Sequence, residues 1–515
     1  MKRRTLLQLG AAAAGLGVIG ATWPEAFVGP AEPGRLLRST ARLPQPYQVP
    51  LPVPAVLQPL HRDADTDYYH LTQRVSDLTI LPGLTTPAWT YGGTFPGPTI
   101  VSRSGRKTTV RHHNTLPVPV AVHLHGGHTP AAHDGYPLDL ILPHSGIPSA
   151  GISHPGMDHS AMMRDTVVGQ RDYTYPMQQR ASTLWYHDHR MDHTGESVWR
   201  GLAGLHLIYD DEEDALPLPR GHRDIPLMIA DRSFAADGSF QYPLNQDGMV
   251  VADYMNGVLG DVILVNGAPW PVLHADPARY RLRILNGSNA RRYRLQLDPQ
   301  PPGGSALVQI GSDGGLLQRP VNHDCLDIAP AERFDVVVDF SRYAPGTQVR
   351  LVNTLGQGNT REVMRFDVVG QDRGDDSSIP AHLSNGVSPL PLDRVAATRT
   401  FKFGLGPKGI WSINDMAYQP GRPLARPRLG DVEIWRFITD VHHPIHVHLN
   451  HFQVLSRNNR APGRYDSGWK DTVDVQPSEA VEIAIRFTDY AGTFLVHCHN
   501  LEHEDMAMMS DFITQ

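Results

Sequence analysis

The chain has 515 residues, a length that suits about three domains at roughly 150 residues each. Hydrophobic residues make up 40% of the chain and charged residues 19%, with 47 Gly and 44 Pro. This composition indicates a globular, turn-rich protein and favours β architecture. The formal net charge of -7 argues against a nucleic-acid partner and an anionic membrane surface, because both require clustered Lys and Arg.

The first segment, residues 1–30, begins with MKRRTLLQLG and continues into a stretch rich in Ala and Gly. The Arg3-Arg4 pair before this stretch resembles a twin-arginine export signal. The alternative is a retained membrane anchor, which requires about 20 strongly apolar residues, and glycines interrupt this stretch. We therefore expect export to the periplasm or the cell exterior, without stable membrane insertion.

A Pro-rich segment, residues 31–64, follows. Its sequence LPQPYQVPLPVPAVLQP is poor in donors for regular hydrogen bonding, so we expect an extended strap or linker on the surface. Over residues 65–214, short β-branched and aromatic runs alternate with turn sequences such as FPGPT. This pattern predicts a first β-sandwich domain.

A second domain is predicted over residues 215–370, where RYRLRIL and RRYRLQL alternate polar and apolar residues with the period of half-buried strands. It contains no dense group of histidines. Residues 371–396 are polar and contain Gly, Ser and Asp, which predicts a linker into a third domain at residues 397–515.

Histidines are concentrated in four motifs of the first and third domains: HLHG, WYHDH, HHPIHVH and HCHNLEHEDMAMM. Residues two apart on a strand share a face, so the histidines of each His-x-His pair converge. The four pairs are His123 and His125, His187 and His189, His446 and His448, and His497 and His499.

Cys498 lies between two of these histidines and must point to the opposite face of its strand. His443 lies three residues before His446, which turns its side chain toward the cysteine side. Together with His503 and Met508, these residues offer a thiolate, two imidazoles and a weak thioether, the ligands of a blue copper site. Zinc is the alternative metal, but it rarely takes a thioether.

Only one other cysteine is present, Cys325 in NHDCLD. Its neighbours do not suggest a metal site, so we expect a small buried residue. Because Cys498 is claimed by a metal, we expect no disulfide framework.

The four histidine motifs, together with YGGTFPGPTI, LVNGAPWP and GWKDTVDV, resemble the multicopper oxidase family. Within it, the chain is similar to the three-domain bacterial laccases of the spore-coat type and to the bilirubin oxidases. The likeness covers most of the chain after the leader. It implies an all-β fold of three cupredoxin-like Greek-key β-sandwiches, with a blue copper site in the third and a trinuclear copper cluster between the first and third.

The resemblance also implies four copper ions, one of type 1, one of type 2 and two of type 3. It assigns His443, Cys498, His503 and Met508 to type 1 copper, and His123 and His446 to type 2 copper. It assigns the type 3 pair to His125, His187, His189, His448, His497 and His499.

We therefore expect a laccase-like oxidase that takes single electrons from phenols, aminophenols or similar small aromatic reductants and reduces dioxygen to water. The reductant is expected to meet an exposed edge of the blue site at His503. Asp134 and Glu504 match acidic residues that relatives use beside the cluster, and we expect them to deliver protons. The alternatives are a turn-forming Asp before Gly and a solvated loop acid.

A second possible function is the oxidation of Cu(I) outside the cytoplasm. Residues 144–163, HSGIPSAGISHPGMDHSAMM, carry histidines and methionines, and thioethers favour Cu(I). The alternative for this segment is a surface loop in which these residues are coincidental. A third possibility, a cupredoxin scaffold without redox activity, conflicts with the complete set of ligands.

Overall fold

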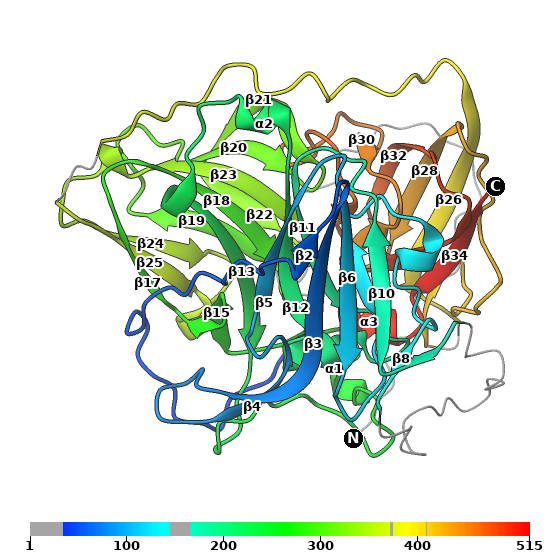
Figure 1. The fold of residues 1–515 in the computed structure, drawn as a ribbon, viewed down its shortest axis with the longest axis horizontal. Helices are drawn as coiled ribbons and strands as arrows, with labels where there is room; N and C mark the ends of the chain where they lie inside the picture. Colours follow the sequence, from blue (N-terminus) through cyan, green and yellow to red (C-terminus); the bar gives the residue numbers. More distant parts are fainter. Residues whose placement is uncertain (1–33, 145–164, 371–373, 408) are drawn as a thin grey trace, which may run out of the picture. The chain divides into compact units, whose positions relative to one another are not determined.

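The computed structural model describes residues 34–144, 165–370, 374–407 and 409–515. Most of the regular structure is β-strand, so the all-β prediction is confirmed. The six larger sheets fall into three pairs along the chain, and each sheet takes its strands from one stretch of sequence (Figure 1). The exact domain bounds given above remain predictions.

The first pair of sheets lies within residues 61–209. One sheet has the order β10 (Gln170–Tyr175), β6 (Lys107–Asn114), β3 (Thr66–Leu78) and β2 (His61–Arg62), with β4 (Thr86–Tyr91) also pairing with β3. The other has the order β5 (Gly97–Arg103), β12 (Ala203–Tyr209), β11 (Ser182–Asp188) and β7 (Val122–His125). Apolar side chains such as Leu124 and Leu184 fill the space between them.

The second pair lies within residues 224–368. Its larger sheet has the order β16 (Ala268–Pro269), β15 (Val262–Val265), β13 (Asp224–Arg232), β18 (Arg279–Asn286), β23 (Arg333–Asp339), β20 (Leu307–Ser312) and β21 (Gly315–His323). Its partner has the order β17 (Val272–Ala275), β25 (Glu362–Val368), β24 (Gln348–Asn353), β19 (Tyr293–Asp298) and β22 (Cys325–Ile328). Cys325 at the start of β22 is only partly buried, so the expectation of a buried residue was wrong.

The third pair lies within residues 395–514. One sheet has the order β27 (Trp411–Ile413), β26 (Val395–Leu405), β28 (Val432–Thr439), β32 (Ala480–Arg486) and β30 (Phe452–Arg457). The other has the order β31 (Thr472–Val475), β29 (His443–Val447), β33 (Gly492–Cys498) and β34 (Met509–Thr514). Their shared core includes Cys498 and Met508 among aromatic and aliphatic side chains.

Shorter elements connect these sheets. The Pro-rich strap runs alongside them, and Leu51 and Leu57 donate backbone hydrogen bonds to Val272 of β17 and Thr99 of β5. Two-stranded pairs join β1 (Arg35–Leu36) to β14 (Val258–Leu259) and β8 (Ile141–Leu142) to β9 (Val167–Val168). The α-helices within the described residues are α1 (Thr194–Arg200), α2 (Asp211–Asp214) and α3 (Leu501–Asp505).

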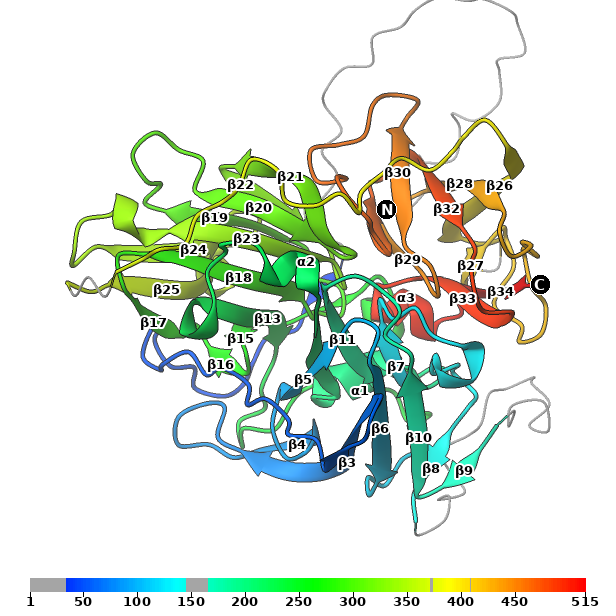
Figure 2. The same cartoon turned by 45° about the horizontal axis from the view of Figure 1, so that its top comes forward.

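Helices α1 and α3 join the first and third pairs of sheets, and they lie next to each other in Figures 1 and 2. The carboxylate of Asp505 in α3 accepts backbone hydrogen bonds from Thr194 and Gly195 in the first turn of α1, both at 2.8 Å. These bonds satisfy two of the backbone N–H groups that a helix leaves unpaired in its first turn. This contact holds the histidine-rich ends of β11 and β33 close together.

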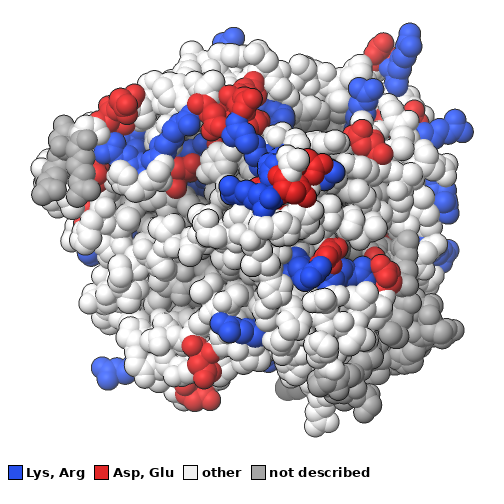
Figure 3. All heavy atoms as spheres, in the orientation of Figure 1, with Lys and Arg blue, Asp and Glu red and all other residues white. Residues whose placement is uncertain are grey.

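On the face drawn in Figure 3, Lys and Arg lie among Asp and Glu, so the described part of that face has no broad area of one charge. Among the described residues, no helix has the length and apolar character needed to span a bilayer. The export signal predicted at residues 1–30 lies outside the described residues.

Candidate metal centres

Strand pairing brings the histidine motifs of distant segments together. In the antiparallel register of β11 and β7, His187 lies opposite His123. In the register of β29 and β33, His446 lies opposite His497. In each His-x-His pair the second histidine lies two residues after the first and points to the same face. The histidine side chains therefore meet where the sheet of β7 and β11 approaches the sheet of β29 and β33.

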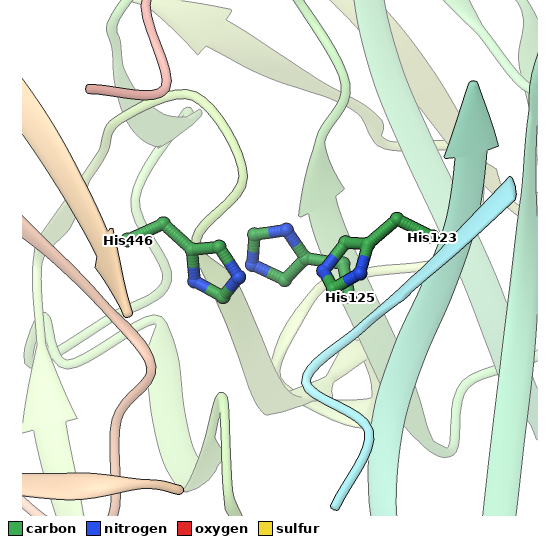
Figure 4. Close-up of side chains that lie close together, drawn as sticks. All are labelled: His123, His125 and His446. Atoms are coloured by element: carbon green, nitrogen blue, oxygen red, sulfur yellow. The ribbon is translucent and has the colours of Figure 1, made fainter. Parts of the chain in front are cut away.

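The rings of His123, His125 and His446 face one another across the boundary between β7 and β29 (Figure 4). The centroids of the His125 and His446 rings are 3.7 Å apart, and those of His123 and His446 are 5.7 Å apart. Two further groups have ligand nitrogens within 4.8 Å of one another: His125, His187 and His499, and His189, His448 and His497. All eight paired histidines of the sequence therefore belong to one buried cluster.

The nitrogens of this cluster are arranged for metal binding. One imidazole nitrogen of each of His123, His187 and His446 meets a backbone carbonyl oxygen at 2.6–2.8 Å. The other nitrogen, Nε2 in each case, is buried and has no hydrogen-bond partner among the described residues. Both ring nitrogens of His499 and Nδ1 of His125 are also unpartnered. Unpaired buried nitrogens are costly, and a bound metal would satisfy them.

Burial keeps these imidazoles neutral. Desolvation lowers the pKa of His123 and His499 well below the ordinary histidine value and lowers the pKa of His187 to about 3. Neighbouring histidines lower these pKa values further, because two imidazolium ions would repel each other. A neutral imidazole has the lone pair that a metal requires.

A second group lies on the other side of β33. Cys498 Sγ is 3.4 Å from His443 Nδ1 and 3.7 Å from His503 Nδ1, and the two nitrogens are 3.1 Å apart. These three side chains are buried. Burial raises the pKa of the Cys498 thiol well above its ordinary value, so a cation is needed to stabilise the thiolate here.

The three methionines that follow α3, Met506, Met508 and Met509, pack against different parts of the structure. Met508 is fully buried in the same apolar core as Cys498, and its carbonyl oxygen accepts a hydrogen bond from Cys498 N at 3.1 Å. Met509 packs instead with Tyr136 and Tyr418. Met506 lies at the border of the core. The arrangement therefore favours Met508 as the thioether beside the cysteine.

Known multicopper oxidases share these segments. Family models described as multicopper oxidase match residues 388–515, 73–147 and 146–213. A laccase from Bacillus stratosphericus is 36% identical over an alignment that covers 89% of this chain and 97% of the relative. The chain belongs to the multicopper oxidase family.

Two other relatives share most of the length of this multicopper oxidase. A bilirubin oxidase from Albifimbria verrucaria is 35% identical, with 93% of this chain and 83% of the relative covered. The crystal structure of a laccase from Pediococcus acidilactici has a TM-score of 0.80 and 32% identity, covering 93% of this chain and 96% of that one. These likenesses confirm the three cupredoxin-like domains and the laccase-like activity predicted from the sequence.

The two predicted acids lie beside the histidine cluster of this multicopper oxidase. Asp134 Oδ2 accepts a hydrogen bond from His448 Nδ1 at 2.7 Å. The two carboxylate oxygens of Glu504 lie 3.1 Å from His497 Nδ1 and 3.6 Å from His189 Nδ1. Both acids are buried, so neither is a solvated loop residue.

The expected exposure of His503 was wrong. The His503 residue is only 1% exposed, because the Trp411 ring lies over it with 3.9 Å between ring centroids. The other histidine beside Cys498, His443, is equally buried but contacts an exposed carboxylate. His443 Nε2 donates to Asp440 Oδ1 at 3.0 Å, and the Asp440 side chain is 44% exposed.

Several residues at these centres were missed in the sequence. Asp471 contacts both His125 and His446, and Asp440 contacts His443. The sequence shows Asp471 within GWKDTVDV, a stretch already similar to the family, but nothing near it along the chain indicates a histidine contact. Asp440 lies three residues before His443, and this proximity was the available signal.

Proposed function

We propose that this laccase-like multicopper oxidase takes single electrons from small electron-rich aromatic molecules at one copper centre and reduces dioxygen to water at a separate three-copper centre. The position of Cys498 carries this proposal. Its sulfur belongs to one buried group of ligands, while its chain neighbours His497 and His499 belong to the other. The two centres are therefore joined by a few covalent bonds.

We assign one copper to each donor set that the chain provides. His443, Cys498, His503 and Met508 would hold type 1 copper, and His123 and His446 would hold type 2 copper. The type 3 pair would be held by His125, His187, His189, His448, His497 and His499. These twelve side chains supply thiolate, thioether and imidazole donors, the ligand types that suit copper. When bound, the coppers supply the one-electron redox steps and the dioxygen chemistry that side chains alone lack.

The surface next to His443 fits an aromatic reductant. Leu405, Ile410 and Val441 are 49%, 44% and 40% exposed, although large apolar side chains are more often buried. The Asp440 carboxylate accepts backbone hydrogen bonds from Leu405 and Val441, which places these residues around it. We propose that a donor hydroxyl binds Asp440 while the ring packs on the aliphatic side chains. His443 is as buried as His503, but its hydrogen bond to the half-exposed Asp440 gives electrons a path from the surface through His443.

We propose that Asp134 and Glu504 supply protons for dioxygen reduction. Each carboxylate contacts the imidazoles of the cluster, and these contacts hold it in place without bulk water. A proton donor must lie within hydrogen-bond reach or one water of its acceptor. The two acids lie on different elements, Asp134 after the turn at Ala131–His133 and Glu504 in α3, so they approach the cluster from separate directions.

Export through a twin-arginine route to the periplasm or the cell exterior remains part of the proposal. The Arg3-Arg4 pair that suggests it lies outside the described residues. Residues 145–164, which hold most of the His and Met residues considered for Cu(I), also lie outside them. Cu(I) oxidation is the less supported alternative, because laccases and a bilirubin oxidase resemble most of this chain.

A panel of reductants tests the proposed function. Purified, copper-loaded protein is given a phenol, an aminophenol, bilirubin or Cu(I), and donor oxidation is measured together with dioxygen uptake. We expect the aromatic donors to be oxidised with four donor electrons consumed per dioxygen and without accumulation of hydrogen peroxide. Rapid turnover of Cu(I) alone, with the aromatic donors inert, would instead establish the metal-ion oxidase.

A further inference from the structure

Asp471 contacts two histidines of the proposed trinuclear centre that come from different domains. Its Oδ1 accepts a hydrogen bond from His125 Nε2 at 3.0 Å, and its backbone oxygen accepts one from His446 Nδ1 at 2.8 Å. His125 ends β7 of the first domain, whereas His446 lies in β29 of the third. One residue thus fixes which nitrogen of each ring faces the cluster.

The carboxylate of Asp471 is itself held by the middle domain, which supplies none of the proposed copper ligands. Arg333, the first residue of β23, donates from Nη1 to Asp471 Oδ1 at 2.7 Å and from Nη2 to Asp471 Oδ2. Arg333 Nε also donates to the carbonyl oxygen of Thr183 in β11 at 2.9 Å. This guanidinium therefore contacts all three domains, and Arg333 is only 1% exposed.

A second residue of the middle domain fixes the same segment. Asp313, in the turn between β20 and β21, accepts from Arg333 N at 2.8 Å. Its other oxygen accepts from the backbone N–H groups of Asp471 and Thr472 at 3.2 and 3.3 Å. The main chain and the side chain of Asp471 are both held from the middle domain.

The space around this contact is closed. Gly126, which follows His125, has φ +85°, a conformation that favours glycine. A Cβ atom there would lie 2.6 Å from Arg333 Nη2 and 2.8 Å from Asp471 Oδ2. The chain at the end of β7 is thus packed directly against the ion pair, and the ion pair has little freedom to move.

We infer that Arg333 and Asp313 are positioning residues for the trinuclear centre, acting through Asp471 on His125 and His446. In His125 the bond to Asp471 occupies Nε2 and leaves Nδ1 toward the cluster, whereas in His446 the bond occupies Nδ1 and leaves Nε2. Carboxylates and backbone carbonyls that hold metal-binding histidines fix the tautomer and the ring orientation. Asp471 Oδ1 also lies 3.6 Å from His446 Nδ1, so the carboxylate lies close to both rings. The middle domain would therefore set the geometry of a copper centre to which it contributes no ligand.

Two conservative variants test this inference, which rests on the copper assignment proposed above. Asp471→Asn keeps the shape but loses the charge and one acceptor, and Arg333→Lys keeps the charge but loses the two-pronged contact. Arg281→Lys is the matched control, because Arg281 is equally buried in the middle domain but pairs with Asp335 and Glu213. Each protein is loaded with copper and dialysed against a chelator.

The loss of type 2 copper is followed by electron paramagnetic resonance, and type 1 copper is followed by the blue absorption. We expect Asp471→Asn to lose the type 2 signal about 10- to 100-fold faster than the wild type, in line with other changes to residues that support metal ligands. Arg333→Lys should show a smaller change in the same direction. Both variants should have an altered type 2 spectrum before dialysis and an unchanged blue absorption, and Arg281→Lys should match the wild type in both.

Type 2 spectra and loss rates equal to those of Arg281→Lys in both variants would overturn the inference and leave the ion pair a purely structural role. If Arg333→Lys does not fold, Asp313→Asn provides the same test, because it leaves the Arg333 and Asp471 pair in place. It is expected to accelerate type 2 loss, and a wild-type rate would again overturn the inference. A wild-type protein that binds copper without blue colour would refute the proposed function instead, so the two failures are distinguishable.

Discussion

Replacing Asp440 with Asn tests where reductants deliver electrons. Asp440 Oδ1 accepts from His443 Nε2 and Val441 N, and Oδ2 accepts from Leu405 N. An asparagine has only one oxygen, so it cannot accept on both sides. The change also removes a negative charge next to a ligand of the proposed type 1 copper, which destabilises the oxidised site relative to the reduced one.

The size of the effect follows from the exposure of the pair. A charged hydrogen bond contributes about 1.5–3 kcal/mol, but the Asp440 side chain is 44% exposed, and solvent screening reduces this to about 0.5–1 kcal/mol. For one electron this corresponds to a rise of about 20–40 mV in the type 1 potential. Loss of about 1 kcal/mol of donor binding raises KM for phenols about fivefold.

The pH dependence of this effect can be predicted. Burial alone would raise the pKa of Asp440, but hydrogen bonds from His443 and Leu405 outweigh it and lower the pKa to about 2. A carboxylate with a lowered pKa contributes its stabilisation above its ordinary pKa and loses it as pH falls toward the lowered value. The difference between the variant and the wild type should therefore stay constant from about pH 5 to 8.

Anaerobic redox titration of the blue absorption measures the potential, and steady-state kinetics with a phenol and with ferrocyanide measure donor binding. Ferrocyanide offers no hydroxyl and is itself negative, so its KM should stay constant or fall. Asp489→Asn is the matched control, because Asp489 is also exposed and also accepts from a histidine, His128 at 2.8 Å. An unchanged phenol KM and an unchanged potential in Asp440→Asn would refute electron delivery through His443.

Four further variants address the proposed copper centres. Cys498→Ser should abolish the blue colour and donor oxidation, and a variant that stays blue with normal dioxygen uptake would show that the cysteine is not a ligand. Met508→Leu should raise the type 1 potential, because the thioether stabilises the oxidised copper; an unchanged or lower potential would point to Met506. Asp134→Asn and Glu504→Gln should keep full copper content and colour. In stopped-flow experiments they should slow reoxidation of the reduced enzyme, most strongly at high pH. Wild-type reoxidation rates across the pH range would exclude proton delivery by these acids.

The histidine clusters could be predicted because their signal is local. Two histidines separated by one residue share a face of a strand, and Cys498 between His497 and His499 must face the other way. Cys498, His503 and Met508 also lie together in one short stretch of the third domain, and His443 comes from a separate stretch of the same domain. The alternation of side chains along a strand is therefore enough to predict this part of the site from the sequence.

The contacts that hold these ligands could not be predicted. Arg333 meets Asp471 across 138 positions of sequence, and the two residues share no motif. The Trp411 ring covers His503, and the pairing of β27 with β26 places Trp411 there. The family resemblance selected Met508 among three nearby methionines, but the physical reason for that choice, the core that each one enters, is visible only in the structure.

The three-histidine groups also bear on the order of events during synthesis. His189 and His497 lie 308 positions apart, yet their Nε2 atoms are within 3.4 Å. A growing chain that has not yet been translated past β33 lacks two of the three groups, because His497 and His499 belong to them, and the remaining group needs His446 of the same domain. We therefore expect the proposed trinuclear centre to be complete only after the last domain has docked, so that metal retention there would report that translation and assembly are finished.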